Sequence, residues 1–462
     1  MSVRCIHLDM KSLFPTADYL IVFLEKLAEA GYTHILLEFE DRFPYEKFPD
    51  FVRKSAYSKA EFRAVAEKCR SLGIGIIPLL QCAGHLDYFL KEDACRHLRE
   101  NGSTYQWCFS DPESFEVWKS MAEEILEVFP DCGYFHIGAD EVRLKEPCPR
   151  CREHDAFELY LERVRQCAGF AASKGKKVLM WDDMFRSRDL ADFAGLLAVV
   201  TPCVWQYREI DREIIRKYAE NGIRYWGASR IQSNDTIYRG MGRQFMMQKN
   251  VDDWAEIEKI YPSDGHIGTV WGRVQSFYPI NTTIVQAIYM AAYQNHSLKY
   301  GVITDRRDFN RKFAAGFFGA PELDMDLLIT WFGIEPQLVK DELVKFLNKV
   351  PRNNDILEIW YMFNEIDLLF AYVDQCFGHD LAAKPKFSRG LVTRSQLDNW
   401  ADGVKIIRER TAALQEELRR VFSKYFAAAE IEEFIEERFS AMLEQNEQWG
   451  KFFDTVSAMP HV

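Results

Sequence analysis

The chain has 462 residues, of which 48% are hydrophobic and 14% aromatic, so it can bury a large core. Its 58 basic and 70 acidic residues give a formal net charge of -12. This charge disfavours attraction to nucleic acid or to an anionic membrane surface. A neutral or weakly charged substrate fits better, and we expect neither nucleic acid nor a membrane as a partner.

The N-terminal segment and the cysteines bear on the compartment. Residues 1–11 lack the apolar stretch of roughly 7 to 15 residues that a secretory signal needs, and no later stretch approaches the roughly 18 apolar residues of a membrane span. The chain has 11 cysteines without a regular spacing. Free cysteines behave as small buried hydrophobes in reducing compartments, so we expect a cytoplasmic protein with most thiols in its core.

Short apolar or β-branched runs alternate with amphipathic stretches from the N-terminus onward, as in successive βα units of a parallel sheet. Eight such runs cover residues 3–9, 34–39, 75–80, 134–138, 178–181, 197–205, 223–228 and 267–271. Because eight strands can close a barrel, the sequence predicts an α/β fold, a (β/α)₈ TIM barrel, at residues 1–300.

Two segments depart from this alternation. Residues 86–112 are too long for an ordinary βα loop and hold Trp107 and Phe109, so this loop could help wall a pocket. After about residue 295 the strand signal ends, and we expect a helical C-terminal region at residues 301–462, packed on the barrel. A charged helix at about residues 395–425 is typical of a solvated face, although an apolar seam there could form a homodimer.

The end of the fourth predicted strand carries two adjacent carboxylates. With a period of two, His136, Gly138 and Asp140 share the face that we expect at the barrel mouth. Gly138 would leave a gap for a ligand that both Asp140 and Glu141 can reach. Crowding and burial raise the pKa of one of two neighbouring carboxylates and leave the other ionised. A general acid beside a charged stabiliser requires this difference. Taken alone, the pair is more typical of a helix cap or of an ion pair with Arg143.

Aromatic residues at other strand ends strengthen the case for a pocket. Trp181, Trp205 and Trp271 end the fifth, sixth and eighth runs, and Trp226 lies within the seventh. A single Trp is more often part of a core, but four on consecutive strands indicate a pocket for a ring with apolar faces. Tyr207 follows Trp205 at the same parity and could offer its hydroxyl to a polar substrate group.

Residues 136–142, HIGADEV, resemble the His-x-Gly-x-Asp-Glu signature of family 20 glycoside hydrolases, the β-N-acetylhexosaminidases. Residues 7–12, 36–49 and 78–91 are similar to the hexosaminidase D branch in particular; they read HLDMKS, LLEFEDRFPYEKFP and PLLQCAGHLDYFLK. The likeness spans roughly residues 3–280.

The resemblance implies a retaining exo-β-N-acetylhexosaminidase that removes terminal β-linked GalNAc or GlcNAc without a cofactor. The family works by substrate-assisted catalysis, in which the 2-acetamido oxygen of the substrate attacks the anomeric carbon and forms an oxazolinium intermediate. On that likeness Glu141 is the general acid and base, and Asp140 orients the acetamido nitrogen and stabilises the cationic intermediate.

The resemblance also implies substrate-binding residues. Trp181, Trp205 and Trp271 match the family's pocket tryptophans, and His85 matches a histidine near the catalytic acid. Glu38 matches a hydroxyl-binding position only weakly, among the acidic residues that end the first two runs.

Two departures from the family leave the sugar preference open. Arg273 stands where many members have Glu, and the usual Tyr-Leu-Asp of the seventh strand is replaced at residues 227–229 by Gly-Ala-Ser. Tyr207 could take over the acetamido contact. The hexosaminidase D likeness favours GalNAc slightly.

Cys148 and Cys151, in a Cys-Pro-Arg-Cys sequence with His154 close behind, make half of a zinc motif. No second CxxC pair completes it, so we assign no metal ligand and favour packed thiols. A structural metal or a disulfide that pins this loop is the next alternative, and redox catalysis is the last.

Two other functions remain open. A metal-dependent TIM-barrel hydrolase could gather its ligands from His7, Asp9, His85, His136 and Asp140, but the His-x-His of such enzymes is missing from the first run. A non-catalytic sugar-binding protein could use the same pocket, although the intact Asp140 and Glu141 argue against a lost activity.

Overall fold

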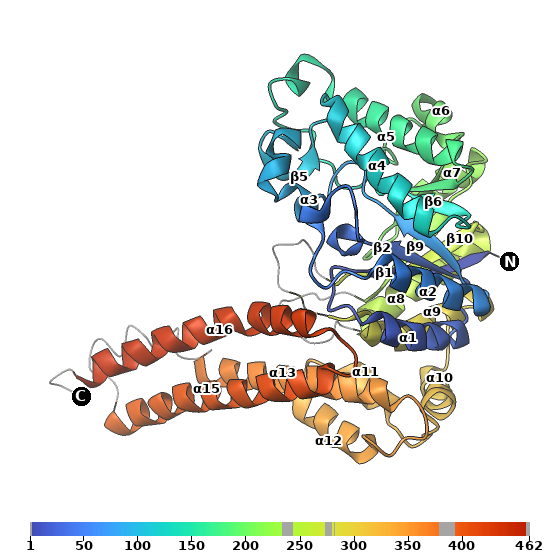
Figure 1. Ribbon diagram of the computed structural model, residues 1–462. Helices are drawn as coiled ribbons and strands as arrows, with labels where there is room; N and C mark the ends of the chain where they lie inside the picture. The colour runs from blue at the N-terminus through green and yellow to red at the C-terminus, as the bar shows by residue number, and fades with distance from the viewer. Residues whose placement is uncertain (1, 233–243, 273–279, 281, 378–392, 459–462) are drawn as a thin grey trace. The chain divides into compact units, whose positions relative to one another are not determined.

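The computed structural model describes residues 2–232, 244–272, 280, 282–377 and 393–458 (Figure 1). These residues form two compact units. The first holds residues 2–232, 244–272 and 287–304, and the second holds residues 280, 282–286, 305–377 and 393–458. No helix in the described ranges has the length and apolar character to cross a membrane.

The first unit is a closed barrel of eight parallel strands, in the order β1-β10-β9-β8-β7-β6-β3-β2. The strands are β1 (Val3–Asp9), β2 (His34–Glu38), β3 (Gly75–Leu79), β6 (Tyr134–His136), β7 (Lys177–Trp181), β8 (Val200–Trp205), β9 (Trp226–Gln232) and β10 (Gly265–Val270). Each of the eight predicted runs supplies one strand, so the prediction of a (β/α)₈ barrel is confirmed.

Several strand boundaries differ from the predicted runs. β6 ends at His136 rather than at residue 138, because Gly138 and Ala139 have φ of 66° and 75°, outside the β region. β8 begins at Val200, because residues just before it form the short helix α6 (Ala194–Leu197). β9 continues to Gln232, so its mouth end lies four residues beyond the predicted end.

Helices follow the strands, and polar side chains begin several of them (Figure 1). Ser58 and Glu61 form a reciprocal capping box at the start of α2, while Asp111 and Asp155 accept backbone N–H groups of α4 and α5. The main helices of this unit are α1 (Ala17–Glu29), α2 (Lys59–Ser71), α4 (Pro112–Val128), α5 (Ala156–Ser173), α7 (Arg212–Glu220), α8 (Gln244–Ile260) and α9 (Ile288–Tyr300).

The barrel interior is filled by side chains and closed by aromatic rings. Buried aliphatic and cysteine side chains form its centre together with Trp181 and Trp226, and Trp205 and Trp271 pack on it while partly exposed. Trp226 contacts Tyr134 with ring centroids 5.2 Å apart. Because these two residues begin β9 and β6, Trp226 belongs to the core at the end opposite the mouth.

The long segment after β3 has structure of its own. It contains the short helices α3 (Asp87–Leu90) and η3 (Asp93–Leu98), and an antiparallel hairpin of β4 (Arg99–Glu100) and β5 (Ser103–Trp107). Trp107 is fully buried against Phe89 and lines no open pocket. Tyr105 of the same hairpin reaches the barrel mouth instead.

The second unit is helical. It contains α10 (Arg306–Phe313), η7 (Ala314–Phe318), α11 (Met325–Trp331), α12 (Pro336–Phe346), α13 (Asn354–Phe377), α15 (Arg394–Phe422) and α16 (Ala428–Ser457). The long helix expected at about residues 395–425 is α15. Its apolar face packs inside this unit, where Trp400 stacks on Phe453 of α16. Association of two copies, and packing of this region on the barrel, stay predictions.

Candidate active site

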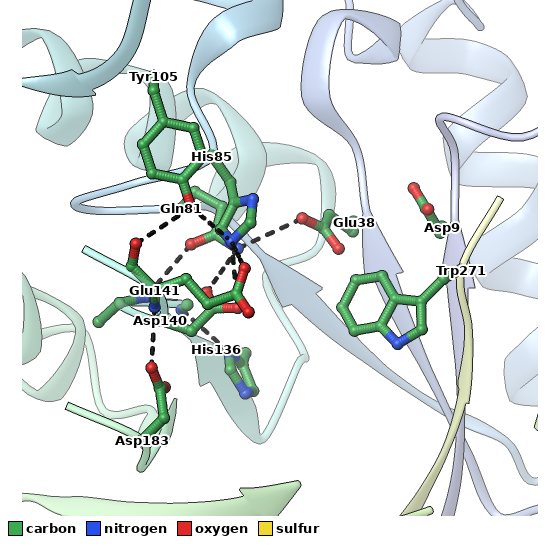
Figure 2. Close-up of polar contacts among 12 residues, drawn as sticks. Asp9, Glu38, Gln81, His85, Tyr105, His136, Asp140, Glu141, Asp183 and Trp271 are labelled. Carbon is green, nitrogen blue, oxygen red and sulfur yellow. Dashed lines mark hydrogen bonds and ion pairs between the residues drawn. The ribbon is translucent and has the colours of Figure 1, made fainter. Parts of the chain in front are cut away.

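Strand register brings acidic residues to one level at the mouth. Asp9 pairs in register with Glu38, Glu38 with Leu79, and Leu79 with His136. In parallel barrels the carboxyl ends of the strands form the functional face. Asp9, Glu38 and the residues that follow His136 therefore meet there (Figure 2).

Asp140 is a buried carboxylate, 7% exposed, with two partners (Figure 2). Its Oδ2 lies 3.4 Å from Nε2 of His85, and its Oδ1 accepts a hydrogen bond of 3.2 Å from the Gln81 amide. Burial favours the neutral form, but His85 and Gln81 outweigh it and lower the pKa of Asp140. Asp140 is therefore ionised at neutral pH.

Glu141 is the accessible member of the pair, with a side chain 51% exposed. Its carboxylate lies 3.4 Å from the same His85 nitrogen. Its backbone has φ of 51°, and its N–H donates to Oδ2 of Asp183 at 2.9 Å. The left-handed backbone turns Glu141 toward solvent while Asp140 stays inside, so two adjacent carboxylates have different environments.

His85 links the two carboxylates. Although burial works against its charged form, Asp140 and Glu141 raise the pKa of His85 to about 10. The ring is then a cation at neutral pH, between two acidic groups. The Tyr105 hydroxyl lies 3.0 Å from its Nε2 and donates to the Glu141 carbonyl oxygen at 3.2 Å.

Glu38 belongs to a second charged group beneath the mouth. It is 2% exposed, and its carboxylate lies 2.9 Å from Nε2 of His7 and 3.4 Å from the Lys11 ammonium. Burial opposes ionisation, but Lys11 and His7 hold the pKa of Glu38 well below its usual value. The Gln81 amide, 3.4 Å from Glu38, joins this group to Asp140.

Aromatic side chains form the other side of the mouth. Trp181 is buried over His136, with ring centroids 4.4 Å apart, while Trp205 and Trp271 are partly exposed. The Trp271 indole donates to the Tyr207 hydroxyl at 3.0 Å. No described residue accepts a hydrogen bond from the indole N–H of Trp181 or Trp205. The wall thus offers apolar ring faces beside polar groups.

The comparisons with known proteins decide the family. The family model for the catalytic domain of glycosyl hydrolase family 20 matches residues 26–275, more than half of the chain. The chain belongs to glycosyl hydrolase family 20.

Curated relatives place this family 20 chain on the hexosaminidase D-like branch. It is 27% identical over 296 residues to hexosaminidase D of Bos taurus, a match that covers 60% of the chain and 86% of that protein. It is 29% identical over 298 residues to hexosaminidase D of Homo sapiens, covering 60% of the chain and 61% of that protein.

Solved structures share the fold of this family 20 chain. An N-acetyl-β-hexosaminidase of Streptomyces plicatus matches with a TM-score of 0.52 at 15% identity, over 69% of this chain and 67% of that chain. A β-N-acetylhexosaminidase of Bacteroides fragilis matches with a TM-score of 0.50 at 16% identity, over 64% and 65%. These likenesses concern the fold alone.

Within the described ranges, the predicted site residues Glu38, His85, Asp140, Glu141, Trp181, Trp205, Tyr207 and Trp271 all lie at the mouth end of the barrel. Arg273 falls outside the described residues. The prediction that Gly138 leaves a gap for a ligand is wrong, because the Gln81 side chain fills that space. A Cβ added at Gly138 would lie 1.9 Å from Oε1 of Gln81.

Gln81, Tyr105 and Asp183 are the residues at this site that the sequence did not single out. Gln81 follows β3 and Asp183 follows β7 by two positions each, so their places after strands were available signals. Tyr105 carries no such signal, because it comes from the hairpin.

The structural alternatives for the Asp-Glu pair are not supported. No described helix begins at residues 140–141, so the pair caps none. The Arg143 guanidinium lies over the Tyr105 ring, 4.3 Å from its centroid, and the Arg143 backbone bonds to Gln106.

The described mouth residues include no group of three potential metal ligands with their ligand atoms close together.

Proposed function

We propose that this family 20 protein is a retaining exo-β-N-acetylhexosaminidase, acting on terminal β-linked GalNAc or GlcNAc by substrate-assisted catalysis. The observation that carries the proposal is the unequal pair at the mouth. Asp140 is buried and ionised beside His85, whereas its neighbour Glu141 is exposed and within reach of the same histidine. One carboxylate is suited to stabilise positive charge and the other to exchange protons with a ligand.

In the first step, the acetamido N–H of the substrate donates to Asp140, which orients the acetamido oxygen toward the anomeric carbon. A bond forms between this oxygen and the anomeric carbon, the glycosidic bond breaks, and Glu141 gives its proton to the leaving oxygen. Charge develops on the oxazolinium ring beside ionised Asp140. Preorganised charge of this kind contributes a large share of catalysis.

In the second step, Glu141 takes a proton from water as the water oxygen attacks the anomeric carbon. The bond to the acetamido oxygen breaks, and the amide is restored. Two inversions at one carbon give net retention. Glu141 ends protonated, ready for another cycle.

The aromatic wall supports an N-acetylhexosamine subsite. Trp181, Trp205 and Trp271 would enclose the acetamido methyl and the sugar face, because stacked apolar rings bury CH groups well. Tyr207, which already accepts from Trp271, would donate its own hydroxyl hydrogen to the acetamido oxygen. Glu38 would serve the outer hydroxyls through the network that it forms with Lys11 and Gln81.

Paired p-nitrophenyl substrates test this function. The wild type should hydrolyse the β-GlcNAc and β-GalNAc substrates but not the β-glucoside, which lacks the acetamido nucleophile. Asp140→Asn should lower kcat by about 10²-fold or more. Glu141→Gln should do so most strongly for poor leaving groups, and Glu146→Gln, an exposed residue in the same loop, is the matched control.

Equal rates on N-acetyl and plain glycosides would exclude substrate assistance. Sugar binding without turnover in the wild type would favour a non-catalytic sugar-binding protein. A metal-dependent hydrolase predicts that His7→Gln and His136→Gln abolish a metal-restored activity, whereas the proposed mechanism routes no step through either side chain.

We also propose a cytoplasmic location. None of the 11 cysteines forms a disulfide, and ten of them are buried. This usage is typical of a reducing compartment.

A further inference from the structure

The structure assigns a metal site away from the sugar pocket: we propose that Cys108, Cys148, Cys151 and Glu100 bind one structural Zn²⁺. One potential ligand atom from each of these four residues lies within 4.8 Å of the other three, and all four residues are buried. The sequence offered only the CxxC half of this set. Glu100 of β4 and Cys108, the residue after β5, come from 48 and 40 residues upstream of Cys148.

The distances fit a tetrahedral ion. Sγ of Cys108 lies 3.6 Å from Sγ of Cys148 and 3.6 Å from Sγ of Cys151. With Zn–S bonds of about 2.3 Å, two thiolates of a tetrahedron lie about 3.8 Å apart. A disulfide would need sulfurs about 2.0 Å apart. The observed spacing is too long for a disulfide and fits ligands around a common centre.

The presence of Glu100 distinguishes this site from a group of thiols that simply pack together. It is 6% exposed, its Oε2 lies 3.1 Å from Sγ of Cys151, and its Oε1 accepts from the Cys148 N–H. A buried carboxylate among thiols is costly without a compensating charge, and a bound Zn²⁺ would supply that charge. The set of three sulfurs and one oxygen closes a four-coordinate site, as structural zinc requires.

Local geometry also suits thiolates. The Cys151 N–H donates to Sγ of Cys148 at 3.5 Å, and the Ser110 hydroxyl donates to Sγ of Cys151 at 3.2 Å. Arg150, which pairs with Asp111 at 2.9 Å, is close enough to interact with Cys108. These donors and this cation would offset the negative charge that four anionic ligands leave around a divalent ion.

The site would fix the loop that carries Glu141. Residues 137–150 contain no strand or helix, and Cys148 and Cys151 lie at their end. Cys108 and Glu100 belong to the hairpin segment that carries Tyr105, which bonds to the Glu141 carbonyl. A metal crosslink would therefore join both segments around Glu141 and reduce the conformational entropy of an irregular loop.

Metal content of the purified full-length protein tests the site without an activity assay. We expect one zinc per chain in protein prepared under reducing conditions without chelator. Cys148→Ser and Cys151→Ser should each lose at least nine-tenths of it, and Glu100→Gln should bind more weakly. Cys95→Ser, a buried thiol outside the set, should keep one zinc.

A second test uses the wild-type protein, so its result does not depend on whether the variants fold. After slow zinc removal and loading with Co²⁺, it should show thiolate-to-cobalt charge transfer and the intense visible bands of tetrahedral cobalt. Amide exchange at residues 141–151 should rise at least tenfold in the metal-free protein, with the barrel strands unchanged. Wild-type protein that neither retains zinc nor takes up Co²⁺ would overturn the site, as would a Cys148–Cys151 disulfide or zinc retained by Cys148→Ser.

Discussion

Nε2 of His85 lies 3.4 Å from Oδ2 of Asp140, and the two groups stabilise each other's charged forms. The pKa of His85 rises to about 10 while that of Asp140 falls. The pair is therefore doubly ionised across the neutral range. This contact gives the site a fixed negative charge with its own counterion, which water cannot easily screen.

Replacing His85 by Asn should lower stability in a pH-dependent way. Asn tolerates the φ of 55° at this position but carries no charge. The raised pKa means that the histidine's contribution is full below about pH 6.5 and is lost as pH rises toward 10. Asp140's contribution is lost only in acid, below pH 3.8. The loss in unfolding free energy should be about 3 kcal/mol near pH 6 and fall toward zero as the pH rises past 10.

Chemical denaturation at pH 6, 8 and 10 checks this expectation. His97→Asn is the control, because His97 is exposed and pairs with Glu113 at the surface. A loss of stability that does not change with pH would contradict a charged His85.

Tyr105→Phe should lower kcat by about tenfold with little change in KM. The variant loses the hydroxyl contacts to His85 and to the Glu141 carbonyl, which orient the catalytic loop but touch no proposed sugar group. Stability should fall by about 1 kcal/mol. Steady-state kinetics with a poor leaving group measure the effect, and Tyr134→Phe at the opposite end of the barrel is the control. Unchanged kcat would remove Tyr105 from this role.

Asp183→Asn should stabilise the protein above pH 6. Burial and repulsion from Asp140 raise the pKa of Asp183 to about 6, so the folded state binds this proton more tightly than the unfolded state. The wild type therefore loses stability as pH rises from about 4 to 6, and the variant should not. We expect a gain of about 1 kcal/mol at pH 7.

The same variant should lose activity, because a neutral amide holds the Glu141 N–H less strongly than a carboxylate does. Thermal unfolding and kcat measured on one preparation test both effects. Asp192→Asn, an exposed aspartate further along the chain, serves as the control. A variant that is less stable than the wild type at pH 7 would show that the folded protein stabilises the ionised carboxylate of Asp183.

Tyr207→Phe should lower kcat/KM for N-acetylhexosaminides by about 10- to 100-fold, since it removes the proposed acetamido donor. Trp271→Phe should lower it too, by freeing the hydroxyl that the indole now fixes. Because both act through one contact, the double variant should lose less than the product of the two single losses. Tyr261→Phe is the control, and fully multiplicative losses would show that the two residues act separately.

Periodicity and motif were sufficient for much of this molecule. Eight runs gave eight strands because buried parallel strands need continuous apolar sequence, which leaves a local signature. The Asp140 and Glu141 pair could be recognised from the sequence because the two carboxylates are adjacent in the chain. The difference in their burial could not be predicted, because it depends on positive φ at Ala139 and Glu141.

The sequence by itself determined the barrel, its family and the identity of the adjacent carboxylates, since each depends on residues close together in the chain. Only the tertiary structure decided that Gln81 fills the space beside Gly138, that Tyr105 reaches His85, and that Glu100 and Cys108 stand beside the CxxC pair. These contacts join segments separated by 20 to 58 residues. Such contacts depend on how loops close in space, and chain spacing carries no record of that geometry.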